Sequence, residues 1–403
     1  ASVVITMIYK EKGHRYELGR YRPIAVMAVL YKIMARCMAD ALQPSLPYLI
    51  APEQNAFQRG KYIFDDNRTV LDAIEYLEQR GRGGVMVFCD QKSAYPRVKW
   101  EFLLRVMERM GLHEDYRMMV QSLYKNASVH MKVNGAVGEG FEMQHGLHQG
   151  CPCSPLLYLL CLQTFMSLMA TDDGDGDASR RLRGIQLPRR DGTEGEVTAL
   201  GYADDLVGML ADEQQLTRFK ELLAVYERGS GAENDWAEKT AAIRVGSLRE
   251  STAMPSEWDG PPEERLFGKE AVIRYLGVFL GAPEGVAREW QRRVTAKVSS
   301  RYAQWAMRGG ARTVFGRNIV VRNSVMAVAW YLVTNQCPPN LDDMLVLWEK
   351  ETWAFVERAG ATGSGAVHIA PRAVMVQDYA EGGARCLDIE RFSRALYMRH
   401  VRR

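Results

Sequence analysis

Residues 199–210 read ALGYADDLVGML, in which two short apolar runs flank the tetrapeptide Tyr202–Asp205. Apolar runs joined by a tight polar tip are typical of a β-hairpin. The hairpin would carry two neighbouring carboxylates, Asp204 and Asp205, out of an apolar sheet. Two ionised aspartates are costly to hold together unless a cation shares them. The stretch alone is compatible with a metal site and with a plain turn that uses Asp for its turn preference.

The composition is that of an ordinary soluble protein, with 403 residues, 47% hydrophobic and 25% charged, which is enough chain for two or three domains. The net charge is only +3, so nucleic-acid binding would depend on local basic patches. Seven irregularly spaced cysteines indicate no disulfide framework and favour a reducing compartment. Neither a membrane span nor a signal peptide is evident. The chain starts at Ala1 inside an apolar run, so we expect flanking domains of a larger protein to be missing.

A third carboxylate follows a second apolar run. Residues 85–89 (VMVFC) read as a buried strand that ends in Asp90, and Tyr95 follows five residues later. An Asp at a strand exit is placed to hold a ligand above the sheet edge, although a turn or N-cap Asp is the plain alternative. In an antiparallel sheet this exit would lie beside the tip at 202–205. Three such carboxylates predict a site for two Mg²⁺ ions about 4 Å apart, with Mn²⁺ as the alternative ion.

Basic and glycine-rich segments could complete a nucleotide site. Residues 3–9 and the run from Tyr21 read as two strands whose link brings Lys10 and Arg22 near one another. Paired basic side chains can cover a triphosphate, although a solvated basic turn is the alternative. The loop at 146–155 is rich in glycine and precedes a helix at 156–169 that is apolar nearly all round and therefore buried. Gly150 would let a nucleotide or template approach the backbone closely.

Two further segments suggest metal sites that their spacing does not support. Cys151 and Cys153 lie near His145 and His148, but the spacing is wrong for common zinc sites. The tract at 171–177 (TDDGDGD) is similar to a calcium loop without its invariant Gly and bidentate Glu, which predicts a mobile insertion instead. The pair Asn134-Gly135 predicts a hairpin between two strands.

Seven motifs in order carry a family resemblance: YRPI (21–24), QNAFQRG (54–60), FCDQKSAY (88–95), GLHQGCPCSPLL (146–157), YADD (202–205), KT (239–240) and YLG (275–277). The series resembles the reverse transcriptases of non-LTR (LINE-like) retrotransposons over roughly residues 3–281. The resemblance implies an α+β right-hand polymerase fold, with fingers and palm, including an antiparallel palm sheet, in residues 1–281. The helical residues 282–403 would form the thumb and C-terminal region.

The resemblance also implies roles for individual residues. The metal-binding aspartates are Asp90, Asp204 and Asp205. The general acid for the leaving pyrophosphate is Lys239. The residues that contact the incoming nucleotide or template are Lys10, Arg22, Tyr95, Gln149 and Gly150, with Tyr95 as the steric gate against a ribose 2′-OH. The primer grip is Tyr275, Leu276 and Gly277.

This chain departs from the family pattern at three places. Pro96 follows the gate aromatic where the family usually has Asp, and the loop usually reads RQGDPLSPLL where this chain has His148, Cys151 and Cys153. Asn234 and Lys239 are five positions apart, whereas the family usually has three. None of these changes touches the three carboxylates.

The predicted function is an RNA-directed DNA polymerase that uses Mg²⁺ to extend a primer 3′-OH. Its expected partners are an RNA template, a DNA primer and dNTPs, with no membrane, and the resemblance implies a nuclear location. The alternatives are an RNA-synthesising polymerase, which Tyr95 argues against, a group II intron-type reverse transcriptase, and an inactive relic that binds nucleic acid through Arg-rich tracts.

Overall fold

The computed structural model describes residues 2–10, 13–125, 127–189, 191–236, 239–251, 258, 271–308, 313–357, 371–381 and 383–401. The chain divides into two compact units, residues 1–267 and residues 268–403. None of the helices in these described ranges combines the length and the apolar character that a membrane crossing requires. All seven cysteines are free thiols.

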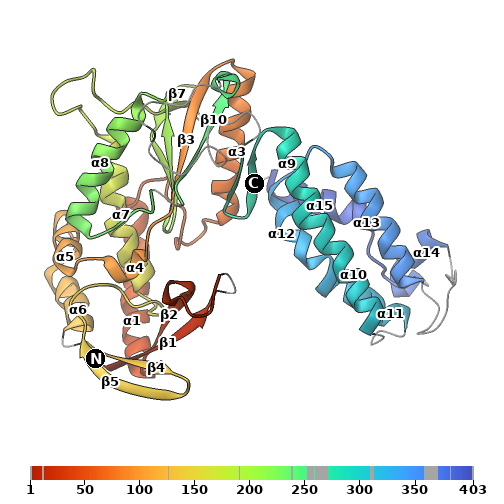
Figure 1. The fold of residues 1–403 in the computed structure, drawn as a ribbon, viewed down its shortest axis with the longest axis horizontal. Coiled ribbons are helices and arrows are strands. Elements are labelled where there is room, and N and C mark those ends of the chain that lie inside the picture. Colours follow the sequence, from red (N-terminus) through yellow and green to blue (C-terminus); the bar gives the residue numbers. More distant parts are fainter. Residues whose placement is uncertain are drawn as a thin grey trace. The chain divides into compact units, whose positions relative to one another are not determined.

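The first unit mixes strands and helices (Figure 1). Its strands are β1 (Ser2–Tyr9), β2 (Tyr21–Val26), β3 (Gly83–Cys89), β4 (Ser128–Val133), β5 (Ala136–Glu142), β6 (Ile185–Pro188), β7 (Glu194–Val197), β8 (Ala199–Tyr202), β9 (Asp205–Leu210) and β10 (Ala241–Gly246). Its α-helices are α1 (Val29–Leu42), α2 (Leu46–Leu49), α3 (Ile63–Gln79), α4 (Ala94–Arg97), α5 (Trp100–Arg109), α6 (Glu114–Tyr124), α7 (Ser154–Ala170) and α8 (Gln215–Ser230).

The sheet with strand order β10-β3-β9-β8 forms the centre of this unit, and all its neighbouring strands are antiparallel. Side chains alternate between the two faces of a strand. Val85, Val87 and Cys89 of β3 belong to the core that α7 and α8 help to build. Met86 and Phe88 face the other side, where α3 lies (Figure 1). Helices on both faces explain why β3 is a continuous apolar run.

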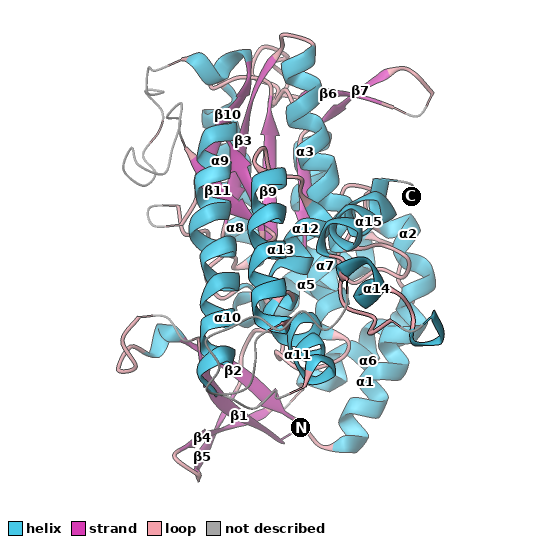
Figure 2. Ribbon diagram, turned by 90° about the vertical axis from the view of Figure 1, so that its right-hand side faces the viewer, coloured by secondary structure: helices cyan, strands magenta, loops and turns pink. Residues whose placement is uncertain are grey.

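The second sheet has the order β2-β1-β4-β5 and lies at the opposite end of the unit from β10 (Figures 1 and 2). The predicted hairpin of residues 3–9 with the run from Tyr21 is present as β1–β2. The predicted hairpin at Asn134-Gly135 is also present, and both turn residues have positive φ, 49° and 87°. This is the geometry that the Asn-Gly pair favours. The parallel pairing of β1 with β4 has no local sequence signal.

Helix α7 is buried nearly all round, as its sequence predicts. Leu157, Leu159, Leu160, Cys161 and Phe165 are fully buried although they point to different sides of the helix. A helix that is apolar on every side is stable only when other elements surround it. Helix α7 therefore anchors the glycine-rich loop that precedes it to the centre of the core.

The acidic tract at 171–177, which the sequence predicts as a mobile insertion, contacts helix α8. Arg218 of α8 donates two hydrogen bonds to the buried carboxylate of Asp172, with distances of 2.6 and 3.1 Å. The same guanidinium also contacts Asp175 and Glu221, each at 2.8 Å. The tract is folded onto α8 because a buried arginine pairs with its charges. The sequence gives no sign of this partner, which lies 46 residues further along the chain.

In its described residues, the second unit is helical apart from one hairpin. Its elements are β11 (Val272–Tyr275), β12 (Val278–Gly281), α9 (Pro283–Trp290), α10 (Ala296–Arg308), α11 (Val314–Val320), α12 (Ala327–Asn335), α13 (Leu341–Val356), α14 (Arg372–Val376) and α15 (Ile389–Val401). One π-helical turn joins α9 to α10 and another joins α11 to α12. Trp290 and Trp348 are fully buried. The side chain of Gln336 ties Trp290 to the hairpin, because its Oε1 accepts hydrogen bonds from the indole and from the Phe279 amide, both at 3.1 Å.

Candidate active site

The stretch around Tyr202 forms the predicted hairpin. Strands β8 and β9 pair with Tyr202 opposite Asp205, so Ala203 and Asp204 make a two-residue turn. Ala203 has φ +57°, in the left-handed region that residues other than glycine seldom adopt. The turn lifts both aspartates to the end of the sheet, where their side chains are accessible to solvent.

Asp90 lies at the same end of the sheet. Cys89 of β3 is opposite Leu206 of β9, so the next residue of each strand toward this end is Asp90 and Asp205. The carbonyl oxygen of Asp90 accepts a hydrogen bond of 2.9 Å from the amide of Asp235, which fixes the backbone at the strand exit. The sheet register therefore brings the three predicted carboxylates together.

The electrostatics of these aspartates show that they disfavour ionisation together. Desolvation by the surrounding protein raises the pKa of Asp205. The charges of Asp204 and Asp90 raise it further, to about 7. Desolvation also raises the pKa of Asp204. The charge of Asp90 raises this pKa further, and the charge of Arg22 lowers it. A bound cation would relieve this repulsion.

Within the described residues, no three His, Cys, Asp or Glu side chains are gathered closely enough to hold a metal ion by themselves. Mg²⁺ usually keeps several waters and binds one or two carboxylates together with substrate phosphates. The donor set of Asp90, Asp204 and Asp205 fits an ion of this kind, because all the ligands are hard oxygens and their negative charges repel one another. Substrate phosphates would supply the remaining ligands of such an ion.

Lys239 pairs with Asp90 and with a second carboxylate, Asp235. Its ammonium is 3.5 Å from the Asp90 carboxylate and 3.4 Å from that of Asp235, which is buried. Lys92 approaches Asp235 as well, at 3.6 Å. Neither Asp235 nor Lys92 was predicted from the sequence to belong to the site, and their spacing gives no signal for a role. Asp235 holds the backbone of Asp90 and the ammonium of Lys239 at once.

Tyr95 is half-buried and stacks on Tyr158 of the buried helix α7, with ring centroids 5.0 Å apart and an interplanar angle of 19°. Its carbonyl oxygen accepts a hydrogen bond of 2.7 Å from the amide of Leu147 in the glycine-rich loop. Burial raises the pKa of Tyr95, and the nearby charge of Asp204 adds to the shift. Stacking on Tyr158 therefore holds the Tyr95 ring in place. The ring is also close enough to Asp204 for the charge of Asp204 to shift the pKa of Tyr95.

The glycine-rich loop also contacts strand β2. The amide of Ala25 donates a hydrogen bond of 2.8 Å to the carbonyl of Gln149. Gly150 has φ +111°, and a Cβ at this position would lie 2.9 Å from the carbonyl oxygen of Ala25. A side chain at Gly150 is excluded by both backbone conformation and space.

The two predicted basic residues differ in their surroundings. Arg22 is exposed on β2, and its charge is close enough to lower the pKa of Asp204. The ammonium of Lys10 instead donates a hydrogen bond of 3.1 Å to the carbonyl of Gly19 in the β1–β2 turn. Of these two residues, Arg22 is the one whose charge acts on the carboxylates.

The residues predicted to grip a primer lie in the second unit. Leu276 and Gly277 form the turn between β11 and β12, with φ +41° and +93°. The hydroxyl of Tyr331 donates a hydrogen bond to the carbonyl of Leu276. A Cβ on Gly277 would lie 2.6 Å from the Tyr331 ring, so this position has room only for glycine. The turn therefore packs against Tyr331 of α12.

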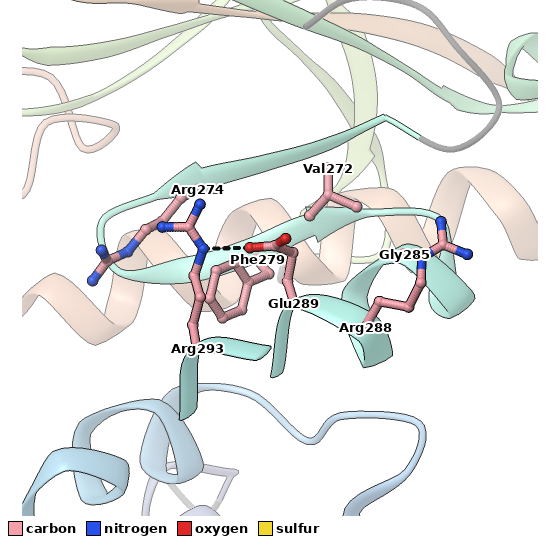
Figure 3. A pocket seen from close by; sticks show the side chains of 7 residues that line it. All are labelled: Val272, Arg274, Phe279, Gly285, Arg288, Glu289 and Arg293. Carbon is pink, nitrogen blue, oxygen red and sulfur yellow. Dashed lines mark hydrogen bonds and ion pairs between the residues drawn. The ribbon is translucent and has the colours of Figure 1, made fainter. Parts of the chain in front are cut away.

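An arginine-lined pocket lies between this hairpin and α9, with a cavity volume of about 260 Å³. In Figure 3 the guanidinium groups of Arg274 and Arg288 lie toward opposite ends of the pocket, and the ion pair of Arg293 with Glu289 lies between them. Three arginines and one glutamate therefore line the pocket. Arginine side chains can contact the phosphates of a polyanion.

Comparison with known protein families identifies the family of this chain. Residues 8–280 match the family described as reverse transcriptase (RNA-dependent DNA polymerase), which covers more than half of the chain. The chain belongs to the reverse transcriptase family. The resemblance that the ordered motifs showed is confirmed at this level, and so are the α+β right-hand polymerase fold and the RNA-directed DNA polymerase class. The roles predicted for individual residues stay predictions.

Among curated proteins, this reverse transcriptase chain is similar to a transposon TX1 149 kDa protein of Xenopus laevis, with 25% identity over 81% of the chain and 24% of that protein. It is also similar to a Pol polyprotein from the type-1 retrotransposable element R2 of Nasonia vitripennis, with 22% identity over 52% of the chain and 18% of that protein. The chain thus spans about a quarter or less of the length of these relatives.

Among solved structures, the chain is similar to telomerase of Candida tropicalis in complex with a TWJ fragment of telomeric RNA. The identity is 14% and the TM-score 0.45, over 88% of this chain and 54% of that one. A telomerase structure from Candida albicans gives 11% identity and a TM-score of 0.42, over 91% and 60% of the two chains.

The stability of the metal-free reverse transcriptase is expected to fall as the pH rises from about 4 to about 7. Asp205, with a pKa raised to about 7, keeps its proton in the folded state over a range where the unfolded chain has lost it. The folded state then binds more protons, so the free energy of unfolding decreases as the pH rises. Buried Asp66, with a pKa of about 7, acts in the same direction.

Thermal melts in EDTA across this pH range measure the effect. Adding Mg²⁺ near pH 8 should raise Tm again, because the cation compensates the ionised carboxylates. Asp205→Asn should remove the contribution of Asp205 to this pH dependence. After solvent screening, that contribution is about 1–2 kcal/mol in the free energy of unfolding. An unchanged pH dependence in Asp205→Asn would contradict the assigned electrostatics.

Proposed function

We propose that this chain catalyses RNA-templated DNA synthesis, adding dNTPs to the 3′-OH of a DNA primer with two divalent ions held by Asp90, Asp204 and Asp205. The observation that supports the proposal is the sheet register, in which Asp90, Asp204 and Asp205 meet at one end of the sheet. Lys239 pairs with Asp90, and the charge of Arg22 acts on Asp204. Membership of the reverse transcriptase family supplies the class of reaction. Mg²⁺ is the proposed ion, and Mn²⁺ is the alternative.

In the proposed reaction the primer 3′-oxygen forms a bond to the α-phosphorus of the dNTP, and the bond from that phosphorus to the bridging oxygen of the pyrophosphate breaks. Divalent ions bound at the carboxylates would ease loss of the hydroxyl proton and compensate charge on the leaving group. The other side chains position substrate and manage charge, as phosphoryl transfer requires.

The protein side chains have separate proposed tasks. Arg22 binds the triphosphate through its guanidinium, and Lys10 is the second basic residue proposed for this contact. Lys239 transfers a proton to the departing pyrophosphate, which carries the negative charge of the broken bond. Gln149 and Gly150 bring their backbone against the nucleotide and template, since the loop is pinned to β2.

Tyr95 is proposed to select deoxyribose by occupying the space of a ribose 2′-OH. Its ring is held by stacking on Tyr158, so it has little freedom to move aside. Tyr95→Val is expected to raise the ratio of kcat/KM for rNTPs to that for dNTPs by about 10–200-fold, the range a pocket contact of this size provides. Tyr95→Phe keeps the ring and should retain the discrimination. Equal sugar preference in Tyr95→Val and the wild type would remove the gate assignment and reopen the RNA-synthesising alternative.

The second unit is proposed to hold the primer strand, with Tyr275, Leu276 and Gly277 at its 3′ end. The arginine-lined pocket beside the same hairpin would contact backbone phosphates. Each phosphate contact releases counterions, so Arg274→Gln should reduce the slope of log Kd against log salt for primer–template by about one. An unchanged slope would place the nucleic acid elsewhere. We keep residues 1–281 as the proposed fingers and palm and 282–403 as the proposed thumb, although the compact units divide at residue 267.

The relatives suggest the source of the chain. Both are retrotransposon or transposon proteins several times longer than this chain. We propose that it forms the reverse transcriptase part of a non-LTR retrotransposon polyprotein that works in the nucleus. Imaging of a tagged longer protein tests the location. An inactive relic would be expected to lose one of the three carboxylates, so their presence favours the active enzyme.

The experiment that tests the function is primer extension with Mg²⁺ on matched RNA and DNA templates. Extension on RNA with dNTPs supports RNA-directed DNA synthesis. Binding of primer–template without any extension would support the nucleic-acid-binding alternative instead.

A further inference from the structure

The segment Gln54–Gly60 (QNAFQRG) has no task in the reaction proposed above, yet it lies directly against the catalytic hairpin. The amide of Asn55 donates a hydrogen bond of 3.1 Å to the carbonyl of Gly201 in β8. The amide of Gly201 donates one of 2.9 Å to the carbonyl of Glu53. This pairing forms a parallel bridge between Gln54 and Gly201 and adds the segment to β8, the edge strand of the sheet β10-β3-β9-β8.

The side chain of Gln54 reaches from this edge to the turn that carries the aspartates. It is fully buried, and its Oε1 accepts hydrogen bonds from the amide of Ala56 at 3.1 Å and from the amide of Ala203 at 3.3 Å. Ala203 is the first residue of the two-residue turn and precedes Asp204 directly. One amide oxygen thus joins the segment to the backbone of the catalytic turn.

Gln54 is itself held in place. Its carbonyl oxygen accepts hydrogen bonds from the amide of the Gln58 side chain and from the ammonium of Lys61, the latter at 3.1 Å. Gly201 provides the space for its side chain, because a Cβ there would lie 2.7 Å from Nε2 of Gln54. Nε2 has no hydrogen-bond partner among the described residues. The contact of Gln54 with the turn therefore depends on its oxygen.

The turn needs an external support. Ala203 has φ +57°, which an alanine adopts only when the surrounding structure over-determines the backbone. The directions of the Asp204 and Asp205 side chains follow from this turn, and a catalytic constellation tolerates displacements of only about 0.5 Å. A buried acceptor for the Ala203 amide is a direct means of holding the turn in this conformation.

We propose that Gln54 is a positioning residue that fixes the Ala203-Asp204 turn and thereby sets the metal-binding geometry of the aspartates. The inference rests on the proposed function for its catalytic consequence, but its effect on metal binding can be measured separately. Gln54 touches neither substrate nor metal in this role and acts through the backbone of Ala203.

The test compares three variants with the wild type. Gln54→Met keeps the length of the side chain and removes the acceptor. Gln54→Glu keeps an acceptor oxygen and replaces Nε2 by a second carboxyl oxygen, and burial favours the protonated, neutral form of this carboxyl. Gln43→Met is the matched control, because Gln43 also anchors this segment, through a hydrogen bond of 2.8 Å to the carbonyl of Phe57, without contacting the turn. The readouts are the Mg²⁺ concentration that gives half of the metal-induced rise in Tm, and kcat and KM for dNTP in primer extension.

Gln54→Met is expected to raise the half-saturating Mg²⁺ concentration about tenfold and to lower kcat by about 10–100-fold, the loss that a misplacement of about 1 Å produces. The KM for dNTP should change little. Gln54→Glu should recover most of both losses, and Gln43→Met should match the wild type.

Two outcomes would overturn the inference: Mg²⁺ dependence and kcat of Gln54→Met that equal those of the wild type, or equal losses in Gln54→Met and Gln43→Met. Either result would make Gln54 a structural part of its own segment. A further outcome is that neither the wild type nor any variant extends a primer, while Gln54→Met, unlike Gln43→Met, still shifts the Mg²⁺ dependence of Tm. In that case the proposed function fails and the positioning role stands. If the wild type extends primers and Gln54→Met behaves identically, the positioning role fails and the proposed function stands.

Discussion

Replacing Asp90 by Asn is expected to slow nucleotide addition on an RNA template by about 10³-fold, because a metal contact contributes several kcal/mol to the charge stabilisation of the transition state. The variant keeps the shape of the side chain and the hydrogen bond from Asp235 to the Asp90 backbone. Primer–template binding should therefore change little. The measurement is the single-nucleotide addition rate at saturating dNTP, together with Kd for primer–template.

The stability of this variant separates loss of function from misfolding. The charge of Asp90 raises the pKa of both Asp204 and Asp205, so removing it relieves repulsion in the metal-free protein. Asp90→Asn should melt at the same or a higher temperature than the wild type in EDTA. Asp191→Asn, in the exposed turn between β6 and β7, is the control and should extend primers normally. An active Asp90→Asn variant would remove Asp90 from the site.

Replacing Arg218 by Met is expected to lower the free energy of unfolding of the first unit by about 3–5 kcal/mol, the cost of leaving a buried charge without its partner. Arg218 and Asp172 are both buried, and Asp172 also accepts a hydrogen bond of 2.7 Å from the amide of Leu182. Without the guanidinium, its carboxylate stays buried and uncompensated. Thermal or urea unfolding of the variant and the wild type measures the loss.

The double variant Arg218→Met with Asp172→Asn should recover part of this stability, because the stranded charge is gone. Arg180→Gln is the matched control. Arg180 pairs with Glu221 at 3.1 Å on the exposed side of the same cluster, where an ion pair contributes about 0–1 kcal/mol. Equal losses in Arg218→Met and Arg180→Gln would show that burial of the cluster has no energetic consequence.

The sequence predicts the parts of the site that depend on local pattern. The apolar runs around Tyr202 determine a hairpin, and the continuous run at 85–89 determines a buried strand that ends in Asp90. Antiparallel pairing of these strands then follows from ordinary sheet geometry. The family resemblance adds Lys239, and the structure brings its ammonium to Asp90 even though the spacing to Asn234 is unusual.

The remaining contacts join residues that are distant in sequence and have no periodic signal. The Gln54 oxygen meets an amide 149 positions away, and its choice of partner depends on how the segment lies against β8. Arg218 looks like any charged residue of an amphipathic helix until the acidic tract folds onto it. Asp235 is an ordinary polar residue in the sequence and becomes a shared anchor only once β10 lies beside β3. Such pairings depend on tertiary packing, which no local pattern encodes.

The most direct test of the carboxylate site is the rate of single-nucleotide addition on an RNA template, measured for the wild type with Mg²⁺, for the wild type in EDTA, and for Asp204→Asn with Mg²⁺. We predict addition in the first reaction and a loss of about 10³-fold or more in the other two. Equal rates for Asp204→Asn and the wild type, or addition that persists in EDTA, would contradict the claim that these carboxylates form a metal-dependent polymerase site.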